Sequence, residues 1–455
     1  MAALTEKTAR FIFETTLAQM PPECLAKAKY HLIDYMAVTL AGSAEEPSRI
    51  IRDYTQAAGT QGHSLILGTA VRVRAEEAAL VNGVQAHVLD YDDVNQSMCG
   101  HPSAAVLPAA LAVAEEAGCS GRQLLEAYIL GVEIAGKLGR VFNPRHYELG
   151  WHATCTLGSL GAAAAAAKIL DLEPAKIRMA LGLAASLAGG LKVNFGTMTK
   201  SYHAGRAAEN GLRAVRLVQR GWDACDYILD DPAWFARPFL GDSACDLASV
   251  GDMLGRPYDI LSPGIIVKKY PSCAFTHPAI DALQQLMAEQ AVAVEVVEEI
   301  VVTLHQMADQ VLIHRRAATG LEGKFCIEYC LASTLVLGGC GLKNFSAPNV
   351  ARPEVQALSA RVQRKVARLS SQAGNVFGPS QVEIRLRDGG SRQATVEVAK
   401  GDPSNPLPDQ EMRQKYLECA AVVYSQDQAE QIFEALQKID QVQSVKQLMD
   451  SLLPG

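Results

Sequence analysis

Two stretches near the middle of the chain consist almost entirely of small residues. Residues 156–172 read TLGSLGAAAAAAKILDL, and residues 175–191 read AKIRMALGLAASLAGGL. Alanine favours helix, and a helix that is small and apolar on most of its faces is typical of a protein interior. Because alanine and glycine lack bulk, neighbouring backbones can approach closely. These stretches predict a core of tightly packed helices, and the aromatic content of only 6% argues against an all-β core.

Helical spacing of apolar residues runs through most of the first 260 residues. Residues 21–42 are one example, because they begin with two prolines and end at Gly42, which are signals of a helix start and stop. Similar patterns return after residue 403. The simplest reading is one large helical domain built from both ends of the chain, residues 1–264 plus 404–455.

The pattern between these parts is different. Residues 296–306 and 381–401 alternate β-branched and polar residues, and Asp388-Gly389-Gly390 is a hairpin signal. Helical stretches lie between the predicted strands. We therefore expect a mostly α protein in which residues 265–403 form an inserted α+β lid domain.

Charge and cysteine usage exclude several classes of protein. The formal charge is −7 and no run of Lys or Arg is present, which argues against nucleic acid as a partner. Eleven cysteines occur without a CxxC pair, which favours reduced thiols in the cytoplasm over a disulfide framework or structural zinc. The start of the chain has no apolar signal core, and no apolar stretch reaches the ~18 residues that span a bilayer. We expect a cytoplasmic protein that contacts no membrane.

Residues 87–103 are the first candidate for chemistry. His87, Asp90 and Asp93 are spaced three apart, so they share one face if the preceding helix continues through them, and His101 opens the next helix. The aspartates could instead cap the following segment, or Asp90, Asp92 and Asp93 could bind a hard cation. Their spacing also matches some terpene cyclases, but those enzymes need an aromatic-lined pocket and this chain is poor in aromatics.

Residues 194–211, NFGTMTKSYHAGRAAENG, place Lys200 and His203 among small residues. No glycine directly precedes Lys200 and no strand leads into it, so a phosphate loop is disfavoured. Thr197 and Lys200 only weakly match a nucleophile–lysine pair, and a Schiff-base lysine is conceivable. A lysine buried between small-residue helices needs a carboxylate partner, which a substrate could supply.

Two further segments carry titratable residues. Tyr147 and His152 lie at the entrance of an alanine-rich helix, where they could simply be structural. Lys268 and Lys269 fall at the predicted domain junction, shortly before His277 at a helix start. Lysines at a junction are often just exposed, although clefts also form there.

Taken together, these groups suit proton transfer at a carbon next to a carboxylate, with lysine and histidine holding the acid groups. The pattern predicts no metal ligand set among them. The candidate residues are Asp90, Asp93, His101, Tyr147, His152, Lys200, His203, Lys268, Lys269 and His277.

The same segments resemble the MmgE/PrpD family, in order from about residue 80 to 415. The matching runs are LDYDDVNQSMCGHPSAAVLPA, HYELGWHATCTLGSLGAA, NFGTMTKSYHAGRAAENG, KKYPSCAFTHPAIDA, GKFCIEYCLA and KGDPSNPLPDQEM. The resemblance implies a helical domain with an α+β lid, a homodimer, and acid–base chemistry that needs no cofactor. It also implies that the active site includes Asp90, His101, Tyr147, His152, Lys200 and His277.

We therefore expect a lyase that decarboxylates or dehydrates a small anionic polycarboxylate similar to cis-aconitate or methylcitrate. Lys200 and His277 would transfer the proton, His101 and His152 would orient or protonate substrate, and Asp90 would tune a histidine. Asp93, His203, Lys268 and Lys269 would help to bind it. Three alternatives remain open: an epimerase of an iminodisuccinate-like dicarboxylate, a non-catalytic polycarboxylate-binding protein, and a metal-dependent hydratase.

Overall fold

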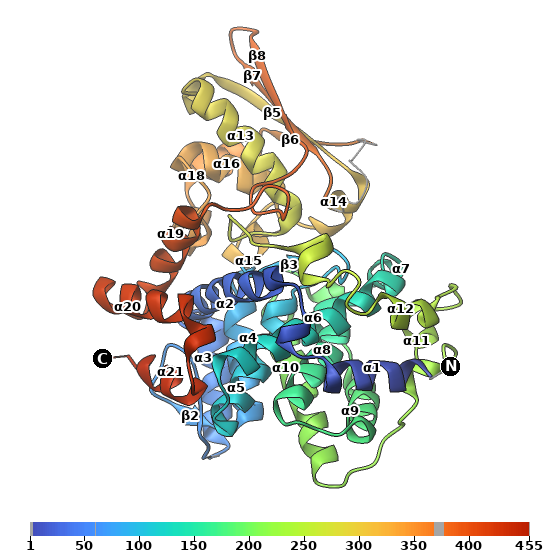
Figure 1. Ribbon diagram of the computed structural model, residues 1–455. Helices are drawn as coiled ribbons and strands as arrows, with labels where there is room; N and C mark the ends of the chain where they lie inside the picture. The colour runs from blue at the N-terminus through green and yellow to red at the C-terminus, as the bar shows by residue number, and fades with distance from the viewer. Residues whose placement is uncertain (1–2, 60, 368–376, 455) are drawn as a thin grey trace.

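Helices form one end of the molecule, and a β-sheet with its own helices forms the other (Figure 1). The computed structural model describes residues 3–59, 61–367 and 377–454. The helices of the N-terminal part are α1 (Leu4–Glu14), α2 (Pro22–Gly42), α3 (Glu46–Ala57), α4 (Ala75–His87), α5 (Pro102–Ala117), α6 (Gly121–Phe142), α7 (Arg145–Glu148), α8 (Ala153–Ile169), α9 (Pro174–Leu187), α10 (Met198–Gln219), α11 (Arg237–Leu240) and α12 (Val250–Met253). The predicted helix at residues 21–42 is thus confirmed.

The sheet lies at the other end of the molecule, in the part of the chain after residue 296. Its strand order is β6-β5-β7-β8, with β5 and β6 parallel and the other pairs antiparallel. These strands are β5 (Val297–Leu304), β6 (Val362–Val366), β7 (Ser380–Leu386) and β8 (Ser391–Val396), and the accompanying helices are α13 (His277–Glu289), α14 (Gln306–Val311), α15 (Gly320–Gly323), α16 (Ile327–Leu337), α17 (Ala347–Val350) and α18 (Pro353–Ser359).

The hairpin expected around Asp388-Gly389-Gly390 is confirmed, since β7 and β8 pair on either side of that turn. The mostly α fold with an α+β part is confirmed as well. Four short strands complete the fold as two small pairs: β1 (Ser64–Leu65) with β2 (Arg72–Val73), and β3 (Val94–Asn95) with β4 (Ile265–Ile266).

The C-terminal helices return to the helical end of the molecule (Figure 1). They are α19 (Asp409–Ala420), α20 (Gln426–Gln437) and α21 (Val445–Ser451). Helix α19 packs along α2, and α21 packs against α5. The division at residues 264/265 and 403/404 stays a prediction.

The small residues allow helices to meet backbone to backbone. Gly83 of α4 faces Gly205 of α10, and a Cβ atom added at Gly83 would lie 2.7 Å from the Gly205 Cα. Such a separation leaves no room for a side chain on either helix. The contact brings the C-terminal end of α4 beside the N-terminal turn of α10, where Lys200 lies.

The described residues include no helix that is long and apolar enough to cross a membrane.

Candidate active site

The loop that follows α4 holds the central carboxylate of the site. Helix α4 ends at His87 and does not continue through Asp90 and Asp93, so these three side chains do not share a helix face. Asp90 instead has a φ of 50°, in the left-handed region that is costly for residues other than glycine. A strained residue of this kind persists only where surrounding contacts fix it.

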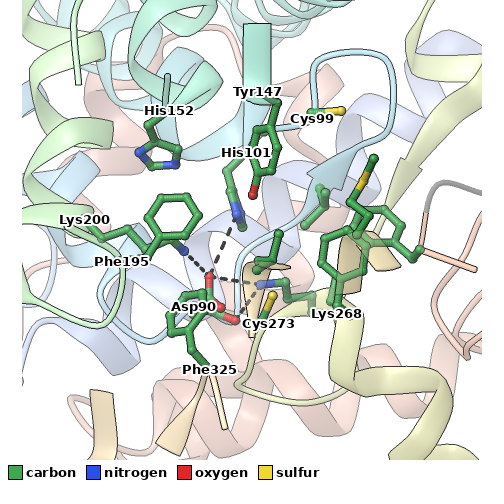
Figure 2. A pocket seen from close by; sticks show the side chains of 17 residues that line it. Asp90, Cys99, His101, Tyr147, His152, Phe195, Lys200, Lys268, Cys273 and Phe325 are labelled. Carbon is green, nitrogen blue, oxygen red and sulfur yellow. Dashed lines mark hydrogen bonds and ion pairs between the residues drawn. The ribbon is translucent and has the colours of Figure 1, made fainter. Parts of the chain in front are cut away.

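Two lysine ammonium groups bracket the Asp90 carboxylate (Figure 2). The Lys200 Nζ atom lies 2.5 Å from Asp90 Oδ1, and the Lys268 Nζ atom lies 3.1 Å from the same oxygen. All three side chains are buried. Although burial opposes ionisation, Lys200 and Lys268 hold the pKa of Asp90 well below its usual range. The carboxylate is therefore ionised at neutral pH.

The backbone of the Asp90 loop is fixed by buried ammonium groups from three distant parts of the chain. Each of its three consecutive carbonyl oxygens accepts one hydrogen bond: Lys324 donates to Leu89 (2.6 Å), Lys268 to Asp90 (2.8 Å) and Lys415 to Tyr91 (3.0 Å). Charge-assisted hydrogen bonds of this type are among the stronger ones in proteins. They account for the persistence of the left-handed conformation at Asp90.

Two of these lysines also hold the segment that carries Lys268. Lys324 donates a second hydrogen bond to the carbonyl of Pro271 (2.9 Å), and Lys415 donates one to the carbonyl of Lys268 (2.8 Å). Lys415 is itself paired with the buried carboxylate of Asp34, at 2.6 Å. Lys324 and Lys415 therefore tie the Asp90 loop to the Lys268 segment. These contacts set the distance between the Asp90 carboxylate and the Lys268 ammonium group.

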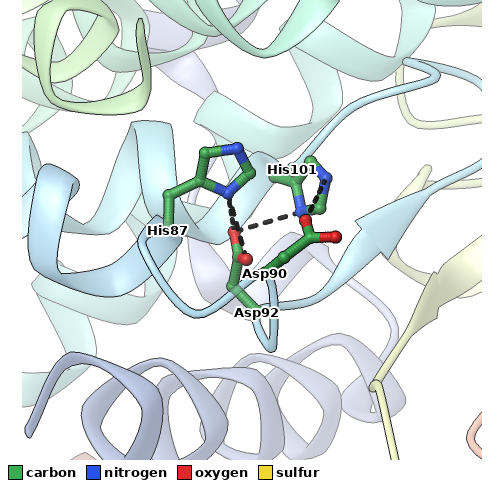
Figure 3. A group of neighbouring side chains, drawn as sticks. All are labelled: His87, Asp90, Asp92 and His101. Carbon is green, nitrogen blue, oxygen red and sulfur yellow. Dashed lines mark hydrogen bonds and ion pairs between the residues drawn. The ribbon is translucent and has the colours of Figure 1, made fainter. Parts of the chain in front are cut away.

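Two histidines lie near the Asp90 carboxylate, His87 at the end of α4 and His101 at the start of α5. His87 Nδ1 lies 2.8 Å from Asp92 and His101 Nδ1 lies 3.1 Å from it, so Asp92 bridges the two rings (Figure 3). The His101 Nε2 atom points toward Asp90, at 3.8 Å. Burial lowers the pKa of His87 to about 3, which leaves its ring neutral with the proton on Nδ1.

A second histidine pair lies next to this group. His152 Nδ1 is 3.0 Å from His203 Nδ1, and the His152 ring stacks on that of His87. Burial lowers the pKa of His152 well below its usual range and that of His203 to about 4. Both rings are neutral at pH 7, so they can exchange or orient protons without adding charge to the site.

His87, Asp90, Asp92 and His101 offer ligand atoms that all lie within 4.8 Å of one another (Figure 3). Two ammonium groups already neutralise Asp90, and a cation placed here would be repelled by both. We therefore interpret the group as an acid–base cluster. Asp93 is not part of it.

A cavity opens beside the Asp90 carboxylate and contains about 530 Å³ of space, part of which is open to solvent. Its lining includes six of the residues expected from the sequence: Asp90, His101, Tyr147, His152, Lys200 and Lys268.

Four expected residues are not part of the described cavity lining. Asp93 accepts hydrogen bonds from Ser103, and His203 contacts His152, which itself lines the cavity. Lys269 lines a separate hollow beside α19. The His277 Nε2 atom hydrogen-bonds the Ser272 carbonyl, at 3.2 Å, so its ring supports the Lys268 segment from behind.

Several residues of the site were not expected from the sequence. Phe195 and Phe325 line the cavity and present their rings to the Lys200 ammonium, at 5.3 and 5.0 Å from the ring centroids. Phe195 belongs to the segment of residues 194–211 that also contains Lys200, so its position in the sequence could have marked it as a candidate site residue. Lys324 and Lys415 gave no signal, because their role depends on contacts between distant segments.

Fold and site together are those of an enzyme with a buried, charged cavity. Residues 6–248 match the MmgE/PrpD N-terminal domain, and residues 270–441 match the MmgE/PrpD C-terminal domain. The chain belongs to the MmgE/PrpD family, and the expectation of a lyase is confirmed at the level of that family.

Similar proteins include three that carry the name cis-aconitate decarboxylase. The protein of Homo sapiens is 26% identical over 466 residues, covering 100% of this chain and 95% of the relative. That of Mus musculus is 26% identical over 468 residues, covering 100% and 94%. That of Aspergillus terreus is 26% identical over 455 residues, covering 95% and 92%.

Acid should destabilise the protein through its buried neutral histidines. Burial, with Lys268 nearby, lowers the pKa of His277 from 6.5 to about 3. Between these values the unfolded chain binds a proton that the folded chain does not, so the free energy of unfolding falls as the pH falls. We expect His277→Gln to reduce this slope by about 1.4 kcal/mol per pH unit between pH 6 and 4, measured by urea unfolding.

The same titration contains its control. Above pH 7 the stabilities of the two proteins should run parallel, whatever the constant difference between them. Equal slopes below pH 6 would show that His277 is not a buried neutral group.

Proposed function

We propose that the chain is a cofactor-independent acid–base lyase that acts on a small di- or tricarboxylate. The reaction would be decarboxylation or dehydration of an acid similar to cis-aconitate or methylcitrate. The observation that carries this proposal is the Asp90 carboxylate held between Lys200 and Lys268 at a cavity that histidines also line. The names of the three decarboxylases support it.

The two ammonium groups are suited to bind a substrate carboxylate and to stabilise charge that develops during reaction. In a decarboxylation, the bond from carbon to the departing carboxylate breaks, and its electron pair moves into the adjoining unsaturated acid. The resulting carbanion would be stabilised by Lys200 and Lys268, in a site where charge is little screened. A proton returned to carbon completes the reaction.

We assign that proton transfer to Lys200 and His101. Both residues line the cavity and both point toward Asp90, whereas His277 hydrogen-bonds the backbone behind it. Asp90 is paired with Lys200, and Asp92 holds His101 by its Nδ1 atom with Nε2 facing the cavity side. His152 and Tyr147 would orient the substrate.

Replacing Lys200 by alanine tests this function. Lys200→Ala removes one ammonium group and leaves Asp90 paired with Lys268, so we expect the protein to fold and turnover to drop by about 10²- to 10³-fold. Proton NMR in deuterium oxide with cis-aconitate, methylcitrate and iminodisuccinate would follow loss of carbon dioxide, loss of water and proton exchange together.

The exposed Lys343→Ala is the matched control and should keep full activity. Near-normal turnover in Lys200→Ala would contradict the proposal. Proton exchange without loss of carbon dioxide or water would indicate the epimerase. Binding without turnover would indicate the non-catalytic protein, and loss of activity in the presence of a chelator would indicate the metal-dependent hydratase.

We also propose that the active form is a homodimer joined through α3 and the start of α10. Ile50, Tyr54, Met198 and Tyr202 are large, apolar or aromatic, and at least a third exposed, and three of them line one shallow hollow. Contiguous exposed side chains of this kind mark interaction surfaces. Because Met198 and Tyr202 flank Lys200 in sequence, the second copy would also hold the first turn of α10.

Sedimentation equilibrium tests the dimer. Tyr54→Arg, which places a charge on a side chain that is 73% exposed, should shift the protein toward monomer. Trp234→Arg, at a similarly exposed aromatic residue on another part of the surface (80%), should not. A monomeric unmodified protein at micromolar concentration would contradict the proposal.

A further inference from the structure

The cavity has two chemically different halves. Around Asp90 the lining carries the charged and polar groups described above, together with the rings of Phe195 and Phe325. The opposite half has an apolar wall. In Figure 2, most of the side chains without labels lie to the right of the Lys268 ammonium, on the side away from Lys200. The wall consists of Val94, Ala274, Phe275, Met307, Val311 and Phe377.

This wall is a packed surface. The rings of Phe275 and Phe377 lie 4.9 Å apart, and His305 Nε2 is 3.0 Å from the Phe377 carbonyl oxygen. Helix α14 supplies Met307 and Val311 from one face. Phe275 and Val311 are buried, whereas Met307 and Phe377 remain partly exposed toward the cavity. The shape of the wall is therefore set before a ligand binds.

A carboxylate that lay against the wall would find no hydrogen-bond donor among the described side chains that form it. Burying an ionised carboxylate without a partner is strongly unfavourable. An alkyl or aryl group in the same place would instead be removed from water, which favours binding by about fourfold for each methylene.

The charges on the other half of the cavity also disfavour a carboxylate at the wall. Lys200 and Lys268 carry two positive charges, and the ionised carboxylates of Asp90 and Asp92 carry two negative charges, with His152 neutral. Each ammonium group can face one substrate carboxylate, and no positive charge remains for a third. A third carboxylate would have to lie against the wall.

We propose that the substrate is a dicarboxylic acid with an apolar substituent, which binds against the wall formed by α14, Phe275 and Phe377. The proposal narrows the proposed di- or tricarboxylate to a dicarboxylate, and it rests on the proposed function for the role of the charged half. The wall recognises the substituent, and the Lys200–Lys268 pair recognises the carboxylates.

Two acids of similar size test the wall without requiring turnover. Tricarballylate is succinate with a carboxymethyl substituent, and 2-isobutylsuccinate carries an isopropyl group in place of that third carboxylate. Titration calorimetry with the full-length protein should show at least tenfold tighter binding of 2-isobutylsuccinate. Equal binding, tighter binding of tricarballylate, or no measurable binding of either acid would overturn the proposal.

Variants of Met307 assign the preference to the wall. Met307→Gln keeps the length of the side chain and adds a polar amide, so it should remove most of the preference for 2-isobutylsuccinate. Met307→Leu keeps the wall apolar and should retain the preference. An unchanged preference in Met307→Gln would place the substituent elsewhere and overturn the assignment.

The two proposals fail separately. If 2-isobutylsuccinate binds preferentially but no acid of the panel turns over, the wall stands and the proposed lyase reaction does not. If cis-aconitate turns over and tricarballylate binds more tightly, the reaction stands and the wall proposal is wrong.

Discussion

The buried ion cluster of Asp90, Lys200 and Lys268 is the interaction on which the rest of the site depends. Leaving one partner of a buried ion pair alone costs about 3–5 kcal/mol, so none of the three groups can be removed without consequence for the others. The cluster is held from behind by Lys324 and Lys415, which bind the carbonyls on either side of Asp90. Its charges therefore stay in place when the cavity is empty, which is the form of preorganisation that electrostatic catalysis requires.

The small-residue helices explain why a lysine can be buried there. Gly83 and Gly205 let α4 and α10 touch through their backbones, and this contact brings the turn after His87 beside Lys200. A larger residue at either glycine would push the helices apart and separate Lys200 from Asp90. Small residues thus do more than indicate a helical core, because close packing at Gly83 and Gly205 also brings Lys200 next to Asp90.

Sequence patterns predicted the features that depend on local spacing. The helix at residues 21–42 and the hairpin at Asp388-Gly389-Gly390 follow from caps, turns and periodicity, and both are confirmed. Strand β6 was not predicted, because its sequence VQRKV carries two cations and pairs with β5 only through the tertiary fold. Helical spacing could not show that α4 ends at His87, so it left open whether Asp93 shares a helix face with His87.

The same limit applies to the site. Lys200 could be singled out because a cation among small residues needs a partner, yet nothing local identified Asp90 as that partner. Lys415 lies 324 residues beyond the Tyr91 carbonyl that it binds, so no spacing rule could connect them. The apolar wall was missed for a related reason: apolar residues in a sequence indicate core, and only the fold shows which of them face a cavity.

The measurement that tests the central claim most directly is a carbon-13 NMR titration of the Asp90 carboxyl group. Aspartate would be labelled selectively, and the signal would be assigned by its absence in Asp90→Asn. A carboxylate held between Lys200 and Lys268 should keep the chemical shift of its ionised form from pH 8 down to the pH at which the protein unfolds. A signal that moves to the protonated position at about pH 4–6, while the protein is still folded, would contradict the account.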